Sequence, residues 1–125
     1  MRKTVSTEEA PEAVGAYSQA VEANGFVFTA GQIPFTPEGE PVEGDIDQQA
    51  EQALSNLESV LNEAGVDLDD VVKVTVFLDD IDDFNEMNST YAEYFSSDPP
   101  ARSAVEAGGL PKGVDVEIEA VAVKE

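Results

Sequence analysis

The sequence predicts an α+β fold in which one mixed β-sheet carries two helices on one of its faces. Two stretches with helical spacing of apolar residues are interspersed with strand-like stretches, in the order β-β-α-β-α-β. Two helices and a single sheet of this kind bury their apolar faces by packing together as two layers. The 125 residues suit one domain, residues 1–125, with a core of ordinary size.

A β-hairpin is expected near the amino terminus. Residues 15–22 lead through Asn24 and Gly25 into the apolar run 26–30. Asn-Gly between two apolar runs is a strong turn signal, because both residues accept the positive φ that a tight turn requires. The polar, turn-rich segment 36–41 then predicts a connecting loop.

A long helix from about Asp47 to Ala64 is the clearest element in the sequence. Its apolar residues recur three and four positions apart and form one stripe. Asp45 or Asp47 can cap its first turn, and Gly65 suits the left-handed residue that often follows a helix. The pattern therefore indicates both ends of this helix and its buried face.

A buried strand over residues 71–78, rich in β-branched residues, and a second helix follow. This helix begins at about Ile81 or Asp83 and ends at Phe95. Its inward-facing apolar stripe consists of Phe84, Met87, Tyr91 and Phe95, and Asn88 lies on the same stripe. A buried amide needs a hydrogen-bond partner. Asn88 therefore either braces a loop or supports a site.

A short strand at Arg102 and a last strand from Val114 to Val123 complete the predicted sheet. Pro99 and Pro100 stiffen the approach to the short strand and disfavour helix there. Two helices cover only one face of such a sheet, and the other face is too apolar to be left in water. We therefore expect a closed homo-oligomer.

Composition excludes several kinds of chemistry. The chain has no cysteine, histidine or tryptophan, which excludes disulfides, thiolate nucleophiles, imidazole triads and Cys- or His-based metal sites. Composition alone still allows an all-oxygen site for a hard cation, but no stretch has the spacing of a calcium loop, and we expect no metal site. Because no run of about 18 apolar residues occurs and the amino terminus lacks the apolar run of a signal peptide, we expect no membrane span and a cytoplasmic location.

The chain is strongly acidic, with 27 acidic and 6 basic residues and a net charge of −21. This charge argues against nucleic acid and anionic membranes as partners. Low lysine with many acids is typical of a halophile's surface, where salt screens self-repulsion; an acidic protein from an ordinary cytosol is the alternative. Arg102 is the only arginine away from the amino terminus. An isolated guanidinium in so acidic a chain predicts a specific anionic ligand.

Five motifs in register resemble the Rid family, the reactive-intermediate (enamine/imine) deaminases. They are Gly15–Ala20, Thr29–Pro34, Met87–Tyr91, Pro100–Ser103 and Val116–Val123. The resemblance runs from about Thr4 to Val123 and implies a chorismate-mutase-like fold and a homotrimer around a central barrel, with three clefts between subunits. It also implies hydrolysis of 2-aminoacrylate and 2-iminobutanoate, products of PLP-dependent dehydratases, to 2-keto acids and ammonia, with no cofactor.

The resemblance also gives roles to individual residues. Arg102 matches the catalytic arginine, and a planar guanidinium suits bidentate capture of a substrate carboxylate. Glu117 matches the acid that orients water for attack on the imine carbon and carries a proton. Tyr17 matches an aromatic residue that lines the cleft, and Asn88 matches an amide that supports the site.

Gly31 and the backbone at Ala104 match positions that closely approach ligand and water. Ala104 stands where the archetype commonly has cysteine, so any thiol chemistry is lost there. Ala16 replaces the usual proline before the tyrosine, and Ala30 replaces a small hydroxyl residue before the glycine. Neither change removes a principal catalytic group, although both could shift substrate preference or rate.

Other interpretations remain open. The main alternative is a non-catalytic or regulatory module of the same fold that binds a keto acid or related small carboxylate; the presence of both Arg102 and Glu117 favours the enzyme. A chaperone-like or ribonuclease role, claimed for some relatives, fits badly with the charge. At single positions, Arg102 could form a structural interface ion pair, Glu117 could be a solvated strand acid and Tyr17 could be packing.

Overall fold

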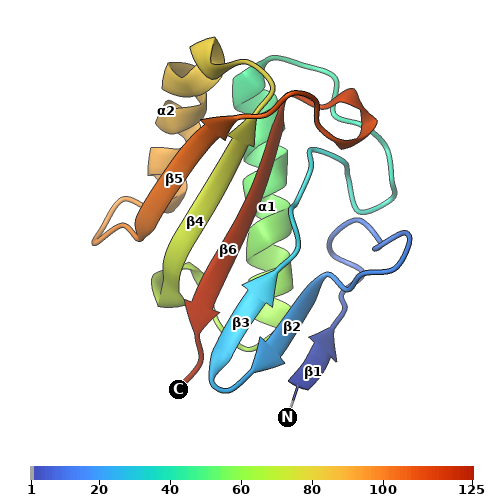
Figure 1. Cartoon of the computed structure of the whole chain (residues 1–125), viewed down its shortest axis with the longest axis vertical. Helices are drawn as coiled ribbons and strands as arrows, with labels where there is room; N and C mark the ends of the chain where they lie inside the picture. The colour runs from blue at the N-terminus through green and yellow to red at the C-terminus, as the bar shows by residue number, and fades with distance from the viewer. Residues whose placement is uncertain (1) are drawn as a thin grey trace.

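The computed structural model describes residues 2–125 and consists of a six-stranded sheet with two α-helices packed against one face (Figure 1). The strands are β1 (Arg2–Val5), β2 (Ala20–Ala23), β3 (Phe26–Thr29), β4 (Val71–Leu78), β5 (Ala101–Glu106) and β6 (Val116–Val123), and the α-helices are α1 (Ile46–Glu63) and α2 (Phe84–Tyr94). The order across the sheet is β1-β2-β3-β6-β4-β5. Among the strands of residues 2–125, only β4 and β5 pair in parallel. The predicted mixed sheet with two helices on one face is confirmed.

The hairpin forms at the predicted turn. Asn24 and Gly25 have φ angles of 55° and 82°, and Phe26 pairs with Ala23 directly across the turn. The first strand of the hairpin is shorter than expected, because β2 begins at Ala20 and the preceding residues form a loop. Gly15, within this loop, has a φ of 105°, which is incompatible with a strand.

β1 is a strand that the sequence pattern did not predict. It pairs with β2 in antiparallel register, from Arg2 opposite Ala23 to Val5 opposite Ala20. Of its four residues only Val5 is buried, so neither alternation nor an apolar run marks the segment. β1 forms one edge of the sheet and β5 the other.

The core lies between the helices and the sheet. α1 begins and ends within one residue of its predicted bounds, and its stripe is buried, with Leu54, Leu57 and Leu61 fully inaccessible. Burying each leucine stabilises the fold by about 2 kcal/mol. On α2, the predicted inward face is also correct: Met87 and Tyr91 are buried. No helix within residues 2–125 is long and apolar enough to span a membrane.

β4 places alternate residues on the two faces of the sheet. Those facing the helices are fully buried and those on the open face are half-buried, namely Val74, Val76 and Leu78 on one side and Lys73, Thr75 and Phe77 on the other. A register shift between Val71 and Lys73 turns Val71 into the core and leaves Val72 45% exposed. The buried face formed by the even positions of β4 therefore begins only at Val74.

The sheet face opposite the helices carries an uncovered apolar patch in the single chain. Phe26 and Phe28 of β3 are 39% and 47% exposed, with ring centroids 6.1 Å apart. They pair with Val123 and Val121 of β6, which are only half-buried. The two helices thus leave one apolar face open, as the element order predicted.

Candidate functional site

Arg102 lies on the helix-covered side of the edge strand β5. It pairs in parallel register with Val74, which is buried against the helices, so both side chains point toward the helix layer. The chain enters β5 through Asp98, in the left-handed region at a φ of 47°, and two prolines. Ala104 is paired with Val76 on the same face and packs against the core.

Three residues of α2 surround the Arg102 guanidinium. Its Nη1 donates a hydrogen bond to Asn88 Oδ1 at 2.6 Å. Its Cζ lies 4.5 Å from the ring centroid of Tyr91 and 5.2 Å from that of Phe84. The spacing of four and three residues places Phe84, Asn88 and Tyr91 on one helix face. Asn88, whose role the sequence left open, is half-buried and braces the arginine rather than a loop.

Glu117 lies on the other side of the sheet. It pairs with Phe77 of β4, whose side chain is on the open face. Its carboxylate approaches Gly31 so closely that a methyl group there would overlap it. Burial raises the pKa of the Glu117 carboxyl above its ordinary value, and the nearby charge of Glu119 raises it further. Glu117 is thus a half-buried acid that holds a proton more readily than an exposed one.

Backbone hydrogen bonds place Gly31 between the loop before β2 and strand β6. The Ala30 N–H donates to the Gln19 carbonyl at 2.8 Å. The Gln32 N–H donates to the Ile118 carbonyl at 2.8 Å, and the Ile118 N–H returns a bond of 3.0 Å. The glycine therefore joins two parts of the chain that are far apart in sequence.

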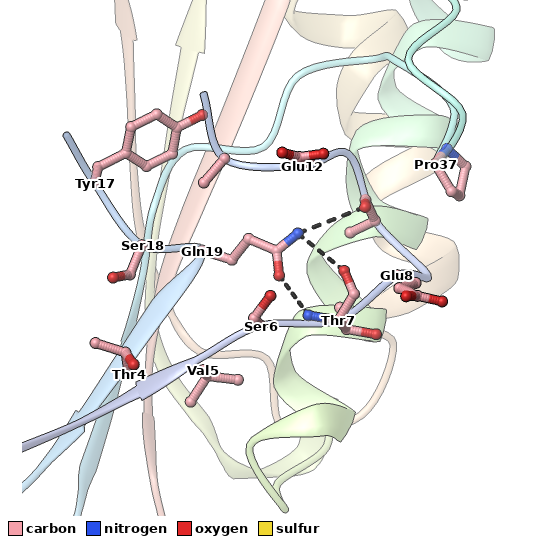
Figure 2. A pocket seen from close by; sticks show the side chains of 12 residues that line it. Thr4, Val5, Ser6, Thr7, Glu8, Glu12, Tyr17, Ser18, Gln19 and Pro37 are labelled. Atoms are coloured by element: carbon pink, nitrogen blue, oxygen red, sulfur yellow. Dashed lines mark hydrogen bonds between the residues drawn. The ribbon is translucent and has the colours of Figure 1, made fainter. Parts of the chain in front are cut away.

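Tyr17 is 55% exposed and lines a polar cavity of about 540 Å³ beside the amino-terminal segment (Figure 2). Figure 2 shows that the neighbouring Gln19 side chain points toward this segment. The Thr7 N–H donates to Gln19 Oε1 at 2.6 Å, and Gln19 Nε2 donates to carbonyls of the same segment. These bonds fix the loop that carries Tyr17. Neither Arg102 nor Glu117 lines the cavity.

Asn56 of α1 holds the loop that follows Gly31. It is 1% exposed, and its Nδ2 donates to the carbonyls of Ile33 at 3.0 Å and Phe35 at 2.8 Å. Sequence reasoning missed this residue. Its position three residues after Ala53, on the apolar stripe of α1, was the available signal.

The chain carries the candidate residues as two separate groups. We call them the arginine half, made of Phe84, Asn88, Tyr91 and Arg102, and the glutamate half, made of Gly31 and Glu117. Tyr17 lines the separate cavity beside the amino-terminal segment. The side chains of Arg102 and Glu117 leave opposite faces of the sheet. A single chain therefore does not bring these two groups together. Within residues 2–125, no cluster of three or more carboxylates is arranged to hold a metal ion.

A family model described as Endoribonuclease L-PSP matches residues 7–124. The chain belongs to this family. A solved structure described as a protein of unknown function of the conserved Rid protein family, from Yersinia pestis, superposes with a TM-score of 0.96 at 44% identity, covering 98% of this chain and 99% of that one. The Rid resemblance and the chorismate-mutase-like fold that it implied are thus confirmed.

Two curated relatives of this Rid-family chain carry different names. The RutC family protein PH0854 of Pyrococcus horikoshii is 53% identical over 126 residues, with all of both chains covered. The Escherichia coli K12 protein named 2-iminobutanoate/2-iminopropanoate deaminase is 44% identical over 127 residues, covering 99% of each chain. The chain is therefore similar over its whole length to a protein named as a deaminase and also to a relative named only by its family.

Proposed function

We propose that this protein is an enamine/imine deaminase that hydrolyses 2-iminobutanoate and 2-iminopropanoate to 2-keto acids and ammonia. The observation that carries the proposal is the guanidinium of Arg102, held in place by Asn88 and two aromatic rings in an otherwise acidic chain. Whole-length similarity to a named deaminase supports it. PLP-dependent dehydratases would supply the unstable substrates.

Arg102 would bind the substrate carboxylate. The bond from Nη1 to Asn88 uses one of the guanidinium donors and leaves the others for a ligand. Two parallel N–H···O bonds to a carboxylate are both stronger and more directional than a single contact. Binding at this point would orient the C=N bond next to the carboxylate.

Glu117 would activate the attacking water. Water adds to the imine carbon while the Glu117 carboxylate accepts its proton, and the same proton then passes to the nitrogen. The Glu117 carboxylate then takes the hydroxyl proton of the tetrahedral carbinolamine and passes it to the nitrogen. The C–N bond breaks as the C=O bond forms, which releases ammonia and leaves the 2-keto acid. The raised pKa of Glu117 favours this transfer, since a better base takes up the proton of water more readily.

We further propose that each site forms at a boundary between two subunits of a homotrimer, with the arginine half from one and the glutamate half from the other. The opposite directions of Arg102 and Glu117 in one chain support this arrangement. The apolar open face, on the side of the sheet that carries Glu117, supplies a surface for association.

A coupled assay tests the activity. Addition of the protein to a threonine dehydratase reaction in concentrated KCl should accelerate 2-ketobutyrate release, and Arg102→Ala should abolish the acceleration. If the wild type leaves the release unchanged, the proposal is wrong. Thermal stabilisation by 2-ketobutyrate without turnover would instead support the carboxylate-binding module.

A further inference from the structure

The Tyr91 hydroxyl has no role in the chemistry proposed above. Tyr91 is 4% exposed, and its buried hydroxyl makes no hydrogen bond within residues 2–125. Buried polar groups are normally paired, so this one needs an explanation. Burial raises the pKa of Tyr91, and the charge of Arg102 offsets this only in part, so the phenol stays neutral.

The ring of Tyr91, in contrast to its hydroxyl, has a clear partner. Arg102 Cζ lies over this ring at 4.5 Å and over the Phe84 ring at 5.2 Å, both within the distance at which a cation is attracted to an aromatic face. Phe95 packs against Tyr91 with ring centroids 4.8 Å apart. Because Tyr91 is packed on this side too, it cannot swing away from the guanidinium.

The rings supply a constraint that the Asn88 hydrogen bond cannot. A single bond at Nη1 fixes one atom of the Arg102 guanidinium and allows its plane to turn about that point. Contact with two ring faces restricts the plane itself. A bidentate ligand needs this plane in one orientation, and fixing it beforehand removes an ordering cost at binding.

We propose that Tyr91 and Phe84 are positioning residues that hold the plane of the Arg102 guanidinium for a small 2-imino or 2-keto carboxylate, and that Tyr91 acts through its ring rather than its hydroxyl. The identity of the carboxylate rests on the proposed function. The contact of two aromatic rings with one guanidinium does not depend on it.

The test compares Tyr91→Phe, Tyr91→Leu and Phe84→Leu. Tyr94→Leu is the matched control, because Tyr94 is an aromatic residue of the same helix whose hydroxyl contacts Glu51 instead of Arg102. Calorimetry gives the Kd for 2-ketobutyrate, the coupled assay gives KM and kcat separately, and melting temperatures report folding.

Tyr91→Phe should keep the Kd and KM within about twofold of wild type, since no hydrogen bond is lost. Tyr91→Leu and Phe84→Leu should raise both by about tenfold with a smaller change in kcat, whereas Tyr94→Leu should change only the melting temperature. If Tyr91→Leu fails to fold, the Kd and KM of Phe84→Leu test the proposal instead. Phe84 is less buried than Tyr91, so its replacement should disturb folding less.

The proposal is overturned if the folded leucine variants bind 2-ketobutyrate like wild type, if Tyr91→Phe behaves like Tyr91→Leu, or if the wild type binds no carboxylate. A wild type that binds 2-ketobutyrate but shows no turnover would refute the deaminase and leave the binding series to decide the role of the rings.

Discussion

Gly31 sets how closely the backbone approaches the Glu117 carboxylate. A methyl group at this position would meet the end of a flexible side chain, so the carboxylate rather than the backbone should move. We expect Gly31→Ala to lower kcat/KM by roughly tenfold or more and to change the free energy of unfolding by less than about 1 kcal/mol. The coupled assay and urea unfolding measure the two quantities.

Gly108→Ala is the control for this substitution, because no heavy atom lies within 4 Å of the new methyl group. It should match wild type in both measurements. Wild-type kinetics in Gly31→Ala would show that the position of the Glu117 carboxylate does not limit the reaction.

The pKa of Glu117 leads to a prediction about pH. A base must be ionised to accept a proton, so activity should fall as the pH drops through this pKa, which burial and Glu119 raise above 4.5. Glu119→Gln removes a like charge and lowers the pKa of Glu117, so the acidic limb of the kcat/KM profile should move to lower pH. Glu93→Gln, the same change at an exposed position of α2, should leave the limb in place. An unmoved limb in Glu119→Gln would argue against Glu117 as the base.

Single residues differed in how far the sequence could identify them. Arg102 was conspicuous by composition, and Asn88 by its place on an apolar stripe. Glu117 was recognised only by family resemblance, because Asp115 and Glu119 share its alternation and its charge. Local patterns cannot rank three such acids, since what separates them is the approach of Gly31, a residue far away in the chain.

At the scale of elements, α1 connects the core to the glutamate half through Asn56. Asn56→Ala would remove the donor that the partly buried carbonyls of Ile33 and Phe35 share. We expect a loss of about 1–3 kcal/mol in the free energy of unfolding, together with lower activity because the loop after Gly31 is released. Urea unfolding and the coupled assay measure both.

Ser55→Ala, an exposed change on the same helix, should stay within about 0.5 kcal/mol of wild type. If Asn56→Ala is equally mild, water has replaced the amide and α1 does not hold this loop.

Helices with a clear periodicity of apolar residues were predicted almost to the residue. Elements and contacts that depend on partners far away in the sequence were not. α1 and α2 have stripes that bury a core and define their bounds. β1 consists of Arg2, Lys3, Thr4 and Val5, of which one is buried, and only pairing with β2 makes it a strand. In the same way, Phe84 and Tyr91 were expected to face inward, but their contact with Arg102 follows from the parallel register of β4 and β5.

For the whole molecule, the separation of the two halves predicts complementation between inactive chains. Arg102→Ala and Glu117→Gln should each be inactive alone. When the two are mixed, unfolded and refolded together, about a quarter of wild-type activity should return, because that is the chance that a boundary receives one intact half from each chain. Separately refolded variants, mixed afterwards, are the control. No recovery after co-refolding would contradict a site shared between subunits.

The charge of −21 predicts a dependence of stability on salt. Within residues 2–125 one ion pair is formed, between Lys124 and Glu22 at 3.1 Å, so most of the carboxylates there have no cationic partner. Because salt screens this repulsion, the melting temperature should rise steeply toward molar KCl. Sucrose, an uncharged solute, should not reproduce the same slope. A melting temperature that does not respond to KCl would refute a halophilic surface.

The arginine half is local in sequence, since its side chains all come from residues 84–102. Its contacts lie within one subunit and need no partner chain, whereas the proposed hydrolysis also needs the glutamate half of a neighbouring subunit. Each newly made subunit would therefore be able to hold a carboxylate before it can hydrolyse anything. Turnover would begin only after the subunits assemble. At protein concentrations low enough for subunits to separate, the reaction rate would therefore increase more steeply than linearly with protein concentration.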